Sequence, residues 1–574
     1  MTQGKLIFVL HSHLPYVLSH GKWPHGMDWL NEAAAETYIP LLQVFTKLVD
    51  EGISPKVTIG ITPVLSEMLA DDVFKSEFAD YLEQKIDAAG ADAGEFYRIG
   101  DTLRHDLARM WEDFYRDTRT FFVGSIGTDI VGAFKKLQDG GHIEIITCAA
   151  THGYLPLLGE DTAVQAQVKL GAETYRRHYG RPPRGIWLPE CAYRPGYEWT
   201  PPVEGFGGPR KRKGVEEFLS ENGIQYFVVD THLLRGGQAT GVYLDRFSAL
   251  KQLWANFESQ YAPVKEDIEK SPHKLYYAAS REGIAPVAFF TRDPETGLQV
   301  WSGEHGYPGD GNYLDFHKKH FPGGHRYWRV TSAQADLADK ELYQPELVEG
   351  RIRENAVHFA DLVKRICFAE GVQDGRPPMI CAPFDTELFG HWWFEGPRWL
   401  YRVLKEVASD PDLEAVTMGE YYDEHTPVDV VSLPEGSWGK GGFHWIWIND
   451  TTRWTWKHVY EAELIMQKAA QTYGTRRDEP VVSLLKLLAR ELVLLESSDW
   501  QFLISTWAAR DYAEMRFSNH NSDFLQVHNL LEKAASGEHL SEADEQLVNN
   551  ISERDTLFRD IDPTWWAGIE YPNG

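Results

Sequence analysis

The stretch Leu6-Ile-Phe-Val-Leu10, followed at once by His11-Ser-His13, decides the fold class of this 574-residue chain. A continuous apolar run without polar alternation is typical of a parallel strand that is buried on both faces. Similar runs recur between helical patterns, at residues 57–61, 143–147, 185–188, 226–229, 287–290 and 379–383. Seven such strands predict an α/β fold built on a seven-stranded (β/α)7 barrel, with residues 415–418 as the alternative eighth strand.

Polar side chains follow almost every predicted strand. They are His11 and His13, His152, Glu190, Asp230 and His232, Arg292 and Asp293, and Asp385. Because the carboxyl ends of parallel strands meet at one end of a barrel, we expect these side chains to gather there and to form a site.

Two carboxylates stand out among these strand ends. Glu190 lies in Trp187-Leu-Pro-Glu190-Cys-Ala-Tyr-Arg194, and Asp385 lies in Pro383-Phe-Asp385-Thr-Glu387. Cleavage of a glycosidic bond requires two such acids, one to attack the sugar and one to protonate the leaving oxygen. We predict Glu190 as the nucleophile, kept ionised by a nearby arginine; the alternative is a structural pair with Arg194.

The surroundings of Asp385 favour the role of general acid. Aromatic neighbours, including Phe384 and Phe389, raise the pKa of a carboxyl group and so let it hold a proton near neutral pH. Two alternatives remain. Asp385 could instead cap the helix that follows it, and Glu387 could serve as the acid in its place.

His11-Ser-His13 has three readings: a metal site, hydrogen bonding to sugar hydroxyls, or a core or structural role. Alternate residues of an extended segment share one face, so the two imidazoles can bind a divalent metal or donate hydrogen bonds to sugar hydroxyls. The metal reading makes the chain a metal-dependent hydrolase that uses His11 and His13. For the chain as a whole, a further alternative is a non-catalytic protein that binds glycans through its aromatic residues and whose carboxylates do no chemistry.

Composition limits the partners. The formal net charge is −28, which disfavours nucleic acid and anionic membranes as partners. The one basic run, residues 210–213, is interpreted as a solvated loop. The four cysteines lack metal or disulfide spacing, and no signal peptide or membrane span is apparent. We expect a cytoplasmic protein without metal or cofactor, either a monomer or a small homo-oligomer.

The chain divides into three predicted parts. Residues 1–69 and 140–426 form the barrel, 70–139 an inserted helical subdomain, and 427–574 a C-terminal α-helical domain. Strands are expected to stop after residue 427. Helical patterns cover residues 452–473, 481–495, 524–535 and 541–551, and Ser541 with Asp544 forms a capping box.

Five segments resemble, in order, the sequence regions that define glycoside hydrolase family 57. They are His11-Ser-His-Leu-Pro-Tyr-Val17, Thr151-His-Gly-Tyr-Leu-Pro156, Trp187-Leu-Pro-Glu-Cys-Ala-Tyr-Arg-Pro195, Ala382-Pro-Phe-Asp-Thr-Glu-Leu-Phe-Gly-His391 and Thr417-Met-Gly-Glu-Tyr421. Within that family the chain is most similar to the 1,4-α-glucan branching enzymes. It shares their long stretch between residues 299 and 331 and their Trp/His run at residues 444–456.

The resemblance implies a barrel, an inserted helical domain and a C-terminal helical domain that helps to close the cleft. It also implies a retaining mechanism on α-glucan, with Glu190 as nucleophile and Asp385 as acid/base, and transfer of the cleaved chain to a 6-hydroxyl to form α-1,6 branches. The predicted substrate-binding residues are His11, His13, His152, Trp187, Arg194, His232, Trp301, Asp310, His391, Trp392, Trp445 and Trp454.

One segment departs from the branching-enzyme pattern. In those enzymes the loop after the Asp-Thr-His segment carries a Tyr at its tip, whereas the tip Arg235-Gly-Gly-Gln238 of loop 232–243 has no aromatic residue. Solvent exclusion favours transfer over hydrolysis. The alternative activity is therefore mainly hydrolytic, like an α-amylase, or that of a 4-α-glucanotransferase.

Overall fold

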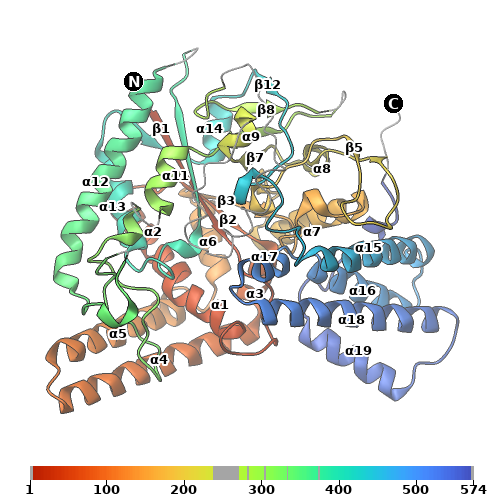
Figure 1. Ribbon diagram of the computed structural model, residues 1–574, viewed down its shortest axis with the longest axis horizontal. Coiled ribbons are helices and arrows are strands. Elements are labelled where there is room, and N and C mark those ends of the chain that lie inside the picture. The colour runs from red at the N-terminus through yellow and green to blue at the C-terminus, as the bar shows by residue number, and fades with distance from the viewer. Residues whose placement is uncertain are drawn as a thin grey trace.

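The computed structural model describes residues 4–236, 270–280, 284–302, 306–332, 334–372 and 375–569. Seven parallel strands at its centre follow one another in the order β10-β1-β2-β3-β4-β7-β9 (Figure 1). Their bounds are β1 Gly4–Ser12, β2 Val57–Ile61, β3 Ile143–Cys148, β4 Gly185–Trp187, β7 Tyr226–Val229, β9 Ala288–Thr291 and β10 Met379–Asp385. A single parallel bridge between Arg292 and Cys381 joins the end of β9 to β10. The predicted seven-stranded barrel is thereby confirmed.

Three short strands enlarge this sheet to ten. β8 (Tyr276–Ala278) pairs antiparallel with β9, β12 (Val430–Val431) pairs with β8, and β11 (Leu413–Ala415) pairs with β1. The expectation that strands stop after residue 427 is wrong, because β8 leaves an edge that β12 occupies. Two residues are too few to give a recognisable sequence pattern. A separate hairpin joins β5 (Glu198–Trp199) and β6 (Arg210–Lys211).

Apolar side chains alternate between two layers along each barrel strand. On β1, Ile7 and Val9 belong to the cluster that fills the barrel, together with Cys148, Trp187 and Cys381 from neighbouring strands. This plug is dry and buried. Since successive side chains point to opposite faces, the interior row of β1 continues from Val9 to His11, at the open end of the barrel.

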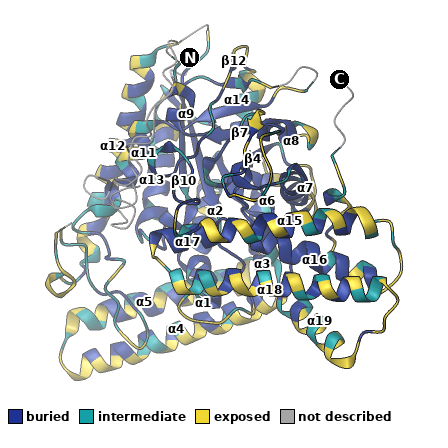
Figure 2. Ribbon diagram, turned by 45° about the vertical axis from the view of Figure 1, so that its right-hand side comes forward, coloured by how far each residue is buried: buried dark blue, intermediate teal, exposed yellow. Residues whose placement is uncertain are grey.

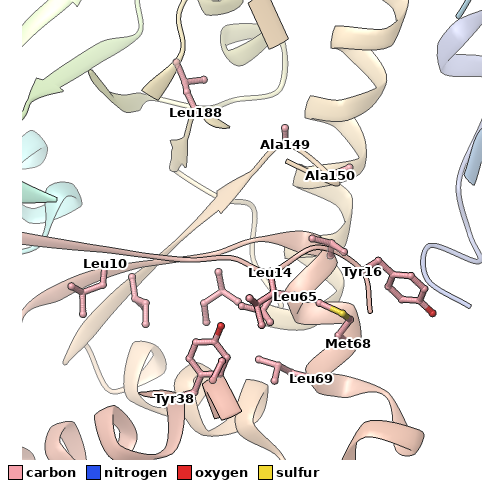
Figure 3. Packing of buried hydrophobic residues seen from close by; sticks show 14 of the residues in the cluster. Leu10, Leu14, Tyr16, Tyr38, Leu65, Met68, Leu69, Ala149, Ala150 and Leu188 are labelled. Carbon is pink, nitrogen blue, oxygen red and sulfur yellow. The ribbon is translucent and has the colours of Figure 1, made fainter. Parts of the chain in front are cut away.

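The outer layer joins the strands to the surrounding helices. Leu14 of the loop after β1 lies beside Leu65, and Tyr38 and Leu69 lie below the strand on the same side as Leu10 (Figure 3). The outward faces of the helices carry the exposed residues, as Figure 2 shows for the C-terminal helices. The barrel is therefore apolar on both sides of its wall, and polar groups concentrate at its ends.

The helices that surround the ring or connect its strands have the following bounds: α1 Met27–Ala33, α2 Ile39–Asp50, α3 Pro63–Ala70, α7 Asp161–Tyr179, α8 Val215–Glu221, α9 Thr231–Arg235, α11 Pro294–Trp301, α12 Pro345–Glu370, α13 Gly396–Ser409 and α14 Met418–Glu424. The N-terminus of α14 is closed by a capping box of Thr417 and Glu420. The alternative eighth strand at residues 415–418 does not form: only Ala415 belongs to a strand, β11, and Met418 already begins α14.

The region predicted as a helical insertion contains α4 (Asp72–Arg98), α5 (Thr102–Thr120) and α6 (Ile130–Asp139). α4 and α5 form a long hairpin that projects from the barrel at the lower left of Figure 1. The segment between α11 and α12 is attached to this hairpin. Trp111 Nε1 donates to Arg326 O at 2.7 Å, and Tyr327 OH donates to Asp92 Oδ2 at 2.7 Å. The insertion thus supports a long loop above the barrel.

Most of the C-terminal helices lie where they were predicted. They are α15 (Arg453–Tyr473), α16 (Val481–Leu495), α17 (Asp499–Thr506), α18 (Arg510–Ala535) and α19 (Glu542–Arg554), and the capping box of Ser541 and Asp544 is present. α18 begins well before residue 524. Arg516 and His520 in its first half are fully buried, so the usual apolar stripe is interrupted there. The domain boundaries themselves stay a prediction.

The basic run at residues 210–213 is not a solvated loop. Arg212 and Lys213 are 3% and 2% exposed. Arg212 Nε donates to Asp161 Oδ1 at 2.5 Å, and Lys213 pairs with Glu221. Two acids, the distant Asp161 and the nearby Glu221, accompany these cations into the interior, as buried charges require.

All four cysteines are buried and free of disulfides. Among the residues that the model describes, no helix has both the length and the apolar character needed to cross a bilayer.

Close packing of α7 on β3 gives a test of the barrel. A Cβ on Gly171 would lie 2.2 Å from the carbonyl oxygen of Cys148, whereas one on Gly94, in an exposed turn of α4, would meet nothing within 4 Å. Gly171→Ala is therefore expected to destabilise the protein by about 2–4 kcal/mol. Gly94→Ala is expected to stabilise it by up to about 1 kcal/mol. Thermal unfolding of the two variants measures both changes in stability. Equal melting temperatures for Gly171→Ala and Gly94→Ala would contradict the close packing of α7 on β3.

Candidate active site

The carboxyl ends of the barrel strands open into a cavity of about 1200 Å³. One side is formed by α4 and the loop between α11 and α12, and the other by residues of α17 and the turn that follows it. The predicted site residues that line this cavity are Glu190, Asp385, His11, His13, His152, His391 and Trp392. The fold therefore brings together both predicted catalytic carboxylates and the histidines.

Glu190 enters the cavity through a turn of left-handed backbone after β4. The φ angle is 61° at Glu190 and 48° at Cys191, a conformation that non-glycine residues adopt only where the surroundings impose it. Trp438 holds the turn at two points. Its backbone N donates to Glu190 O at 3.0 Å, and its indole Nε1 donates to Glu190 Oε2 at 2.7 Å. The carboxylate consequently has one fixed direction.

Burial raises the pKa of Glu190 to about 8. The hydrogen bond from Trp438 opposes this shift, and the negative charges of Asp385 and Asp499 add to it. The prediction that an arginine keeps Glu190 ionised is wrong. Arg194 is fully buried and lies 3.9 Å from Asp161 instead, because its side chain points away from the cavity into the packing around α7.

Asp385 is the last residue of β10 and belongs to the inward row of that strand. β10 and β1 pair in parallel with His11 opposite Asp385, so both side chains reach the same end of the barrel. Asp385 occupies the N-cap position of a short 3-10 turn, but its side chain makes no capping hydrogen bond. The alternative role as a helix cap is therefore not supported.

Glu387 lies in the same cavity but is held by protein groups. Its Oε1 accepts hydrogen bonds from Tyr38 OH at 2.5 Å and from the backbone N of His13 at 3.2 Å. Burial raises its pKa to about 8, and the charge of Asp385 contributes. These bonds make Glu387 a support for the wall of the site and leave Asp385 as the better candidate for the acid.

The three predicted histidines form a stack on the floor of the cavity. His11 Nε2 lies 3.1 Å from His152 Nε2, the rings of His13 and His152 are stacked with centroids 4.0 Å apart, and His11 stacks on Trp187 at 4.8 Å. Burial lowers the pKa values of His11 and His152 well below the ordinary value. Both imidazoles are therefore neutral at pH 7 and are able to donate and accept hydrogen bonds.

The C-terminal helices complete the site with residues that were not predicted. Asp499, at the start of α17, accepts from His13 Nε2 at 2.9 Å, and Ser498 Oγ lies 2.8 Å from His152 Nδ1. Burial alone would raise the pKa of Asp499, but His13 lowers it below its ordinary value. Figure 1 shows α17 between the barrel and α18. The only feature of the sequence that could have pointed to these two residues is the polar run Ser497-Ser-Asp499 after a long apolar helix.

Trp438 is the other residue that was not predicted. It lies in the glycine-rich stretch Gly436-Ser-Trp438-Gly-Lys-Gly-Gly442, which has no strand or helix pattern. His232 supports this stretch from behind, since its Nε2 lies 3.0 Å from Gly442 O. Trp187 packs against the other side of Trp438, with the two ring centroids 5.0 Å apart. His232 and Trp187 are thus close to the site without lining the described cavity.

Besides Trp187, Arg194 and His232, four more predicted substrate-binding residues lie elsewhere than in the described cavity wall: Trp301, Asp310, Trp445 and Trp454. Trp301 is 3% exposed with its ring near Phe384, and Asp310 accepts from Arg351 at 2.6 and 2.9 Å. Trp454 packs on Phe517 and is 37% exposed. The part of loop 232–243 from residue 237 onward lies outside the described residues.

The arrangement suits group transfer on a polyhydroxylated substrate. Two carboxyl groups interact electrostatically within one cavity, neutral imidazoles supply hydrogen bonds, and Trp392 and Trp438 supply aromatic surface. A metal-dependent hydrolase would use His13 as a ligand together with His11, but His13 Nε2 is bound to the carboxylate of Asp499, and the cluster of possible metal ligands around His11 in the described residues does not include His13.

Comparison with known proteins agrees with this geometry. A family model described as "Glycosyl hydrolase family 57" matches residues 7–434, and one described as "1,4-alpha-glucan branching enzyme, C-terminal" matches residues 458–566. The two matches together span the barrel and the C-terminal helices.

Individual relatives are similar over nearly the whole chain. The 1,4-alpha-glucan branching enzyme TK1436 of Thermococcus kodakarensis is 42% identical over 97% of this chain and 78% of its own length. The crystal structure of a GH57-type branching enzyme from Pyrococcus horikoshii has a TM-score of 0.87 at 40% identity and covers 100% of this chain and 98% of that one. The α-amylase AmyC of Thermotoga maritima has a TM-score of 0.79 at 30% identity, with full coverage of both chains.

The raised pKa of Glu190 predicts a dependence of stability on pH. Its ordinary value is 4.5 and its value in the fold is about 8. Below pH 4.5 the group is protonated in both states and costs nothing, whereas above pH 8 the fold must hold a buried charge, at a cost of at most about 5 kcal/mol. Glu190→Gln should therefore raise the melting temperature more at pH 8.5 than at pH 5.

The control for this comparison is Glu198→Gln, at an exposed position on β5. Its melting temperature should follow that of the unmodified protein at both pH values. A Glu190→Gln variant with the same stabilisation at pH 5 and at pH 8.5 would mean that the carboxyl group has no raised pKa.

Proposed function

This chain belongs to glycosyl hydrolase family 57, and on that premise we propose that it is a 1,4-α-glucan branching enzyme that acts by retention. Glu190 is the nucleophile and Asp385 the acid/base. The observation that carries the proposal is the convergence of these two carboxylates in one cavity, where the charge of Asp385 acts on Glu190. The relatives named branching enzymes support the choice of reaction.

The reaction proceeds in two displacements. Glu190 attacks the anomeric carbon of an α-1,4-linked glucose as its bond to the glycosidic oxygen breaks, and Asp385 gives its proton to that oxygen. The non-reducing portion of the chain then remains bound to Glu190 as an ester. In the second step Asp385 takes the proton of a 6-hydroxyl as that oxygen attacks the anomeric carbon, and the ester bond breaks to release Glu190 as a carboxylate. Two inversions leave the α configuration.

The first step needs an ionised Glu190 and a protonated Asp385. With the cavity unoccupied by sugar, burial favours the proton on Glu190, whose pKa is about 8. Positive charge that develops on the sugar in the transition state favours the ionised form of Glu190, and the indole donor of Trp438 stabilises that form. The reactive form of the site therefore has an ionised Glu190 beside a protonated Asp385.

Transfer requires the second glucan chain to compete successfully with water. Features that support this are the depth of the cavity, its Trp392 and Trp438 surfaces, and the contribution of α17 to its wall. The missing tip Tyr in residues 235–238 works against it. Hydrolysis of α-1,4 bonds is the second candidate function, and the full-length similarity to the α-amylase AmyC favours it.

The cellular setting is part of the proposal. Four buried cysteines without disulfides are compatible with a reducing compartment, so we place the enzyme in the cytoplasm, in the synthesis of a glycogen-like storage glucan. No nucleic acid, membrane or cofactor is needed for the proposed reaction. A monomeric or small homo-oligomeric state stays a prediction.

The decisive experiment is incubation of the purified protein with amylose. New reducing ends and new α-1,6 linkages are counted in the same sample, by a reducing-sugar assay and by proton NMR with debranching. A branching enzyme adds α-1,6 linkages while reducing ends stay nearly constant. Reducing ends that rise without α-1,6 linkages would assign the chain as a hydrolase, and the absence of both would reject the proposal.

Replacement of each catalytic carboxylate should have a distinct signature. Glu190→Gln is expected to lower kcat by several orders of magnitude with every substrate, because no ester can form. Asp385→Asn should lose as much on amylose but far less on an aryl α-glucoside, whose leaving group needs no proton. Steady-state kinetics on both substrates distinguish the roles; an equal loss for Asp385→Asn on both would exclude it as the acid.

Removal of the indole donor should shift the pH dependence of the reaction. Trp438→Phe loses the hydrogen bond that stabilises ionised Glu190, so the pKa of Glu190 should rise further. The acidic limb of kcat/KM is expected to move to higher pH by about one unit, which corresponds to about a tenfold loss below that limb. Trp454→Phe, whose indole donates to Thr451 O, is the control and should leave the limb in place.

A further inference from the structure

We propose that His11, Cys148 and His152 form a binding site for a borderline or soft transition-metal ion such as Zn²⁺, and that the bound ion blocks the cavity. Metal binding itself is independent of the enzyme's reaction, whereas the inhibition rests on the proposed function. The site is distinct from the metal-dependent reading of the sequence, because it uses a thiol in place of His13 and supplies no catalytic group.

The geometry of the three side chains meets the requirements of a metal site. His11 ends the interior row of β1, Cys148 ends β3, and His152 follows in the loop after β3. One ligand atom from each residue lies within 4.8 Å of the other two, and all three residues are buried. The two Nε2 atoms are 3.1 Å apart, close to the separation of about 3.3 Å that tetrahedral zinc with bonds of about 2.0 Å imposes on two nitrogens.

The chemistry of the ligands selects the metal. Two imidazoles and one thiolate suit Zn²⁺ and Cu⁺, while Mg²⁺ and Ca²⁺ prefer sets of oxygen ligands. Metal binding replaces the hydrogen bond between the two Nε2 atoms, and the proton of Cys148 Sγ leaves to solvent. In addition, His11 Nδ1 is buried without a hydrogen-bond partner among the described residues, so the ring is free to change its tautomer.

The electrostatic surroundings favour a cation. Glu190 Oε1 lies 4.0 Å from His152 Nδ1, and Asp499 lies 2.9 Å from the adjacent His13. Asp499, whose pKa is lowered, is ionised and close enough to attract a divalent ion, and Glu190 would add a second negative charge once it loses its proton.

A second cluster in the described chain provides a contrast. His20, His520 and Asp555 also have ligand atoms within 4.8 Å of one another. There, however, Arg516 Nη2 lies 3.1 Å from His520 Nε2, and Arg554 Nε donates to Asp555 at 2.9 Å. Arg554 already neutralises the acid, Arg516 occupies the side of His520, and both guanidinium groups repel a cation, so this cluster is assigned no metal.

An ion can reach the proposed site from solvent. His11 and His152 both line the 1200 Å³ cavity, and Cys148 lies next to them at the end of β3. An ion at this position would occupy the floor between the histidines and Glu190. Because it would compete with the sugar for the same floor, the expected inhibition is competitive with glucan.

Cobalt and zinc titrations test the proposal. Addition of CoCl₂ to the full-length protein should produce a sulfur-to-cobalt charge-transfer band in the near ultraviolet with a stoichiometry of one, and ZnCl₂ should displace it. Cys148→Ala should abolish the band and raise the Zn²⁺ concentration needed for half-inhibition by at least about tenfold. Basal branching should remain, because Cys148 takes no part in the reaction.

The matched control is Cys381→Ala, another buried cysteine of the barrel interior, which should keep both the band and the sensitivity to zinc. Cys148→Ser serves as a second variant if the alanine loosens the core. The absence of a thiolate band in the unmodified protein, or its equal loss in both alanine variants, would overturn the proposal. A protein that shows the cobalt band but does not branch amylose would refute the proposed function and leave the metal site standing.

Discussion

The in-register pairing of β1 with β10 is the constraint on which the site depends. Val9 lies opposite Pro383 and His11 opposite Asp385, so the row that fills the barrel with apolar side chains becomes polar at the same level on both strands. A shift of one residue would turn Asp385 into the outer layer and its neighbour Phe384 toward solvent. The apolar cluster inside the barrel fixes this register, because every second side chain of each strand must point into that cluster.

The mouth concentrates groups that are costly to bury. Glu190 and Glu387 both have pKa values of about 8, and Glu190 has left-handed backbone. The surrounding parts hold these groups in place: Trp438 bonds to Glu190, Tyr38 bonds to Glu387, and the C-terminal Asp499 bonds to His13. Such placement of strained and buried polar groups is common where the structure serves chemistry at the expense of stability.

Much of the fold and the carboxylates of the site could be predicted from local sequence. The strands are short apolar runs, and the rule that barrel sites lie at the carboxyl ends of strands applies to Glu190, Asp385 and the histidines alike. The predictions that were wrong concern residues whose interaction partners lie far away in the sequence. The direction of Arg194 and the burial of Arg212 are both set by Asp161, which no local pattern connects to them.

The remaining omissions have a similar cause. Trp438 lies in an irregular glycine-rich stretch, and Asp499 at the start of a short helix. Neither position has a periodicity that would point to the barrel. Their roles arise only when the C-terminal quarter of the chain folds against the open end of the barrel. The resemblance to a known family indicated that such a closure exists but did not identify these two residues.

The reliance of His13 on Asp499, 486 positions downstream, has a consequence for biosynthesis. A ribosome that adds roughly 5–20 residues per second needs tens of seconds to travel from one to the other. During that interval the barrel lacks the side of the cavity that α17 forms. A polypeptide that ends before residue 499 accordingly lacks both the contact that holds His13 and the part of the cavity wall that α17 supplies.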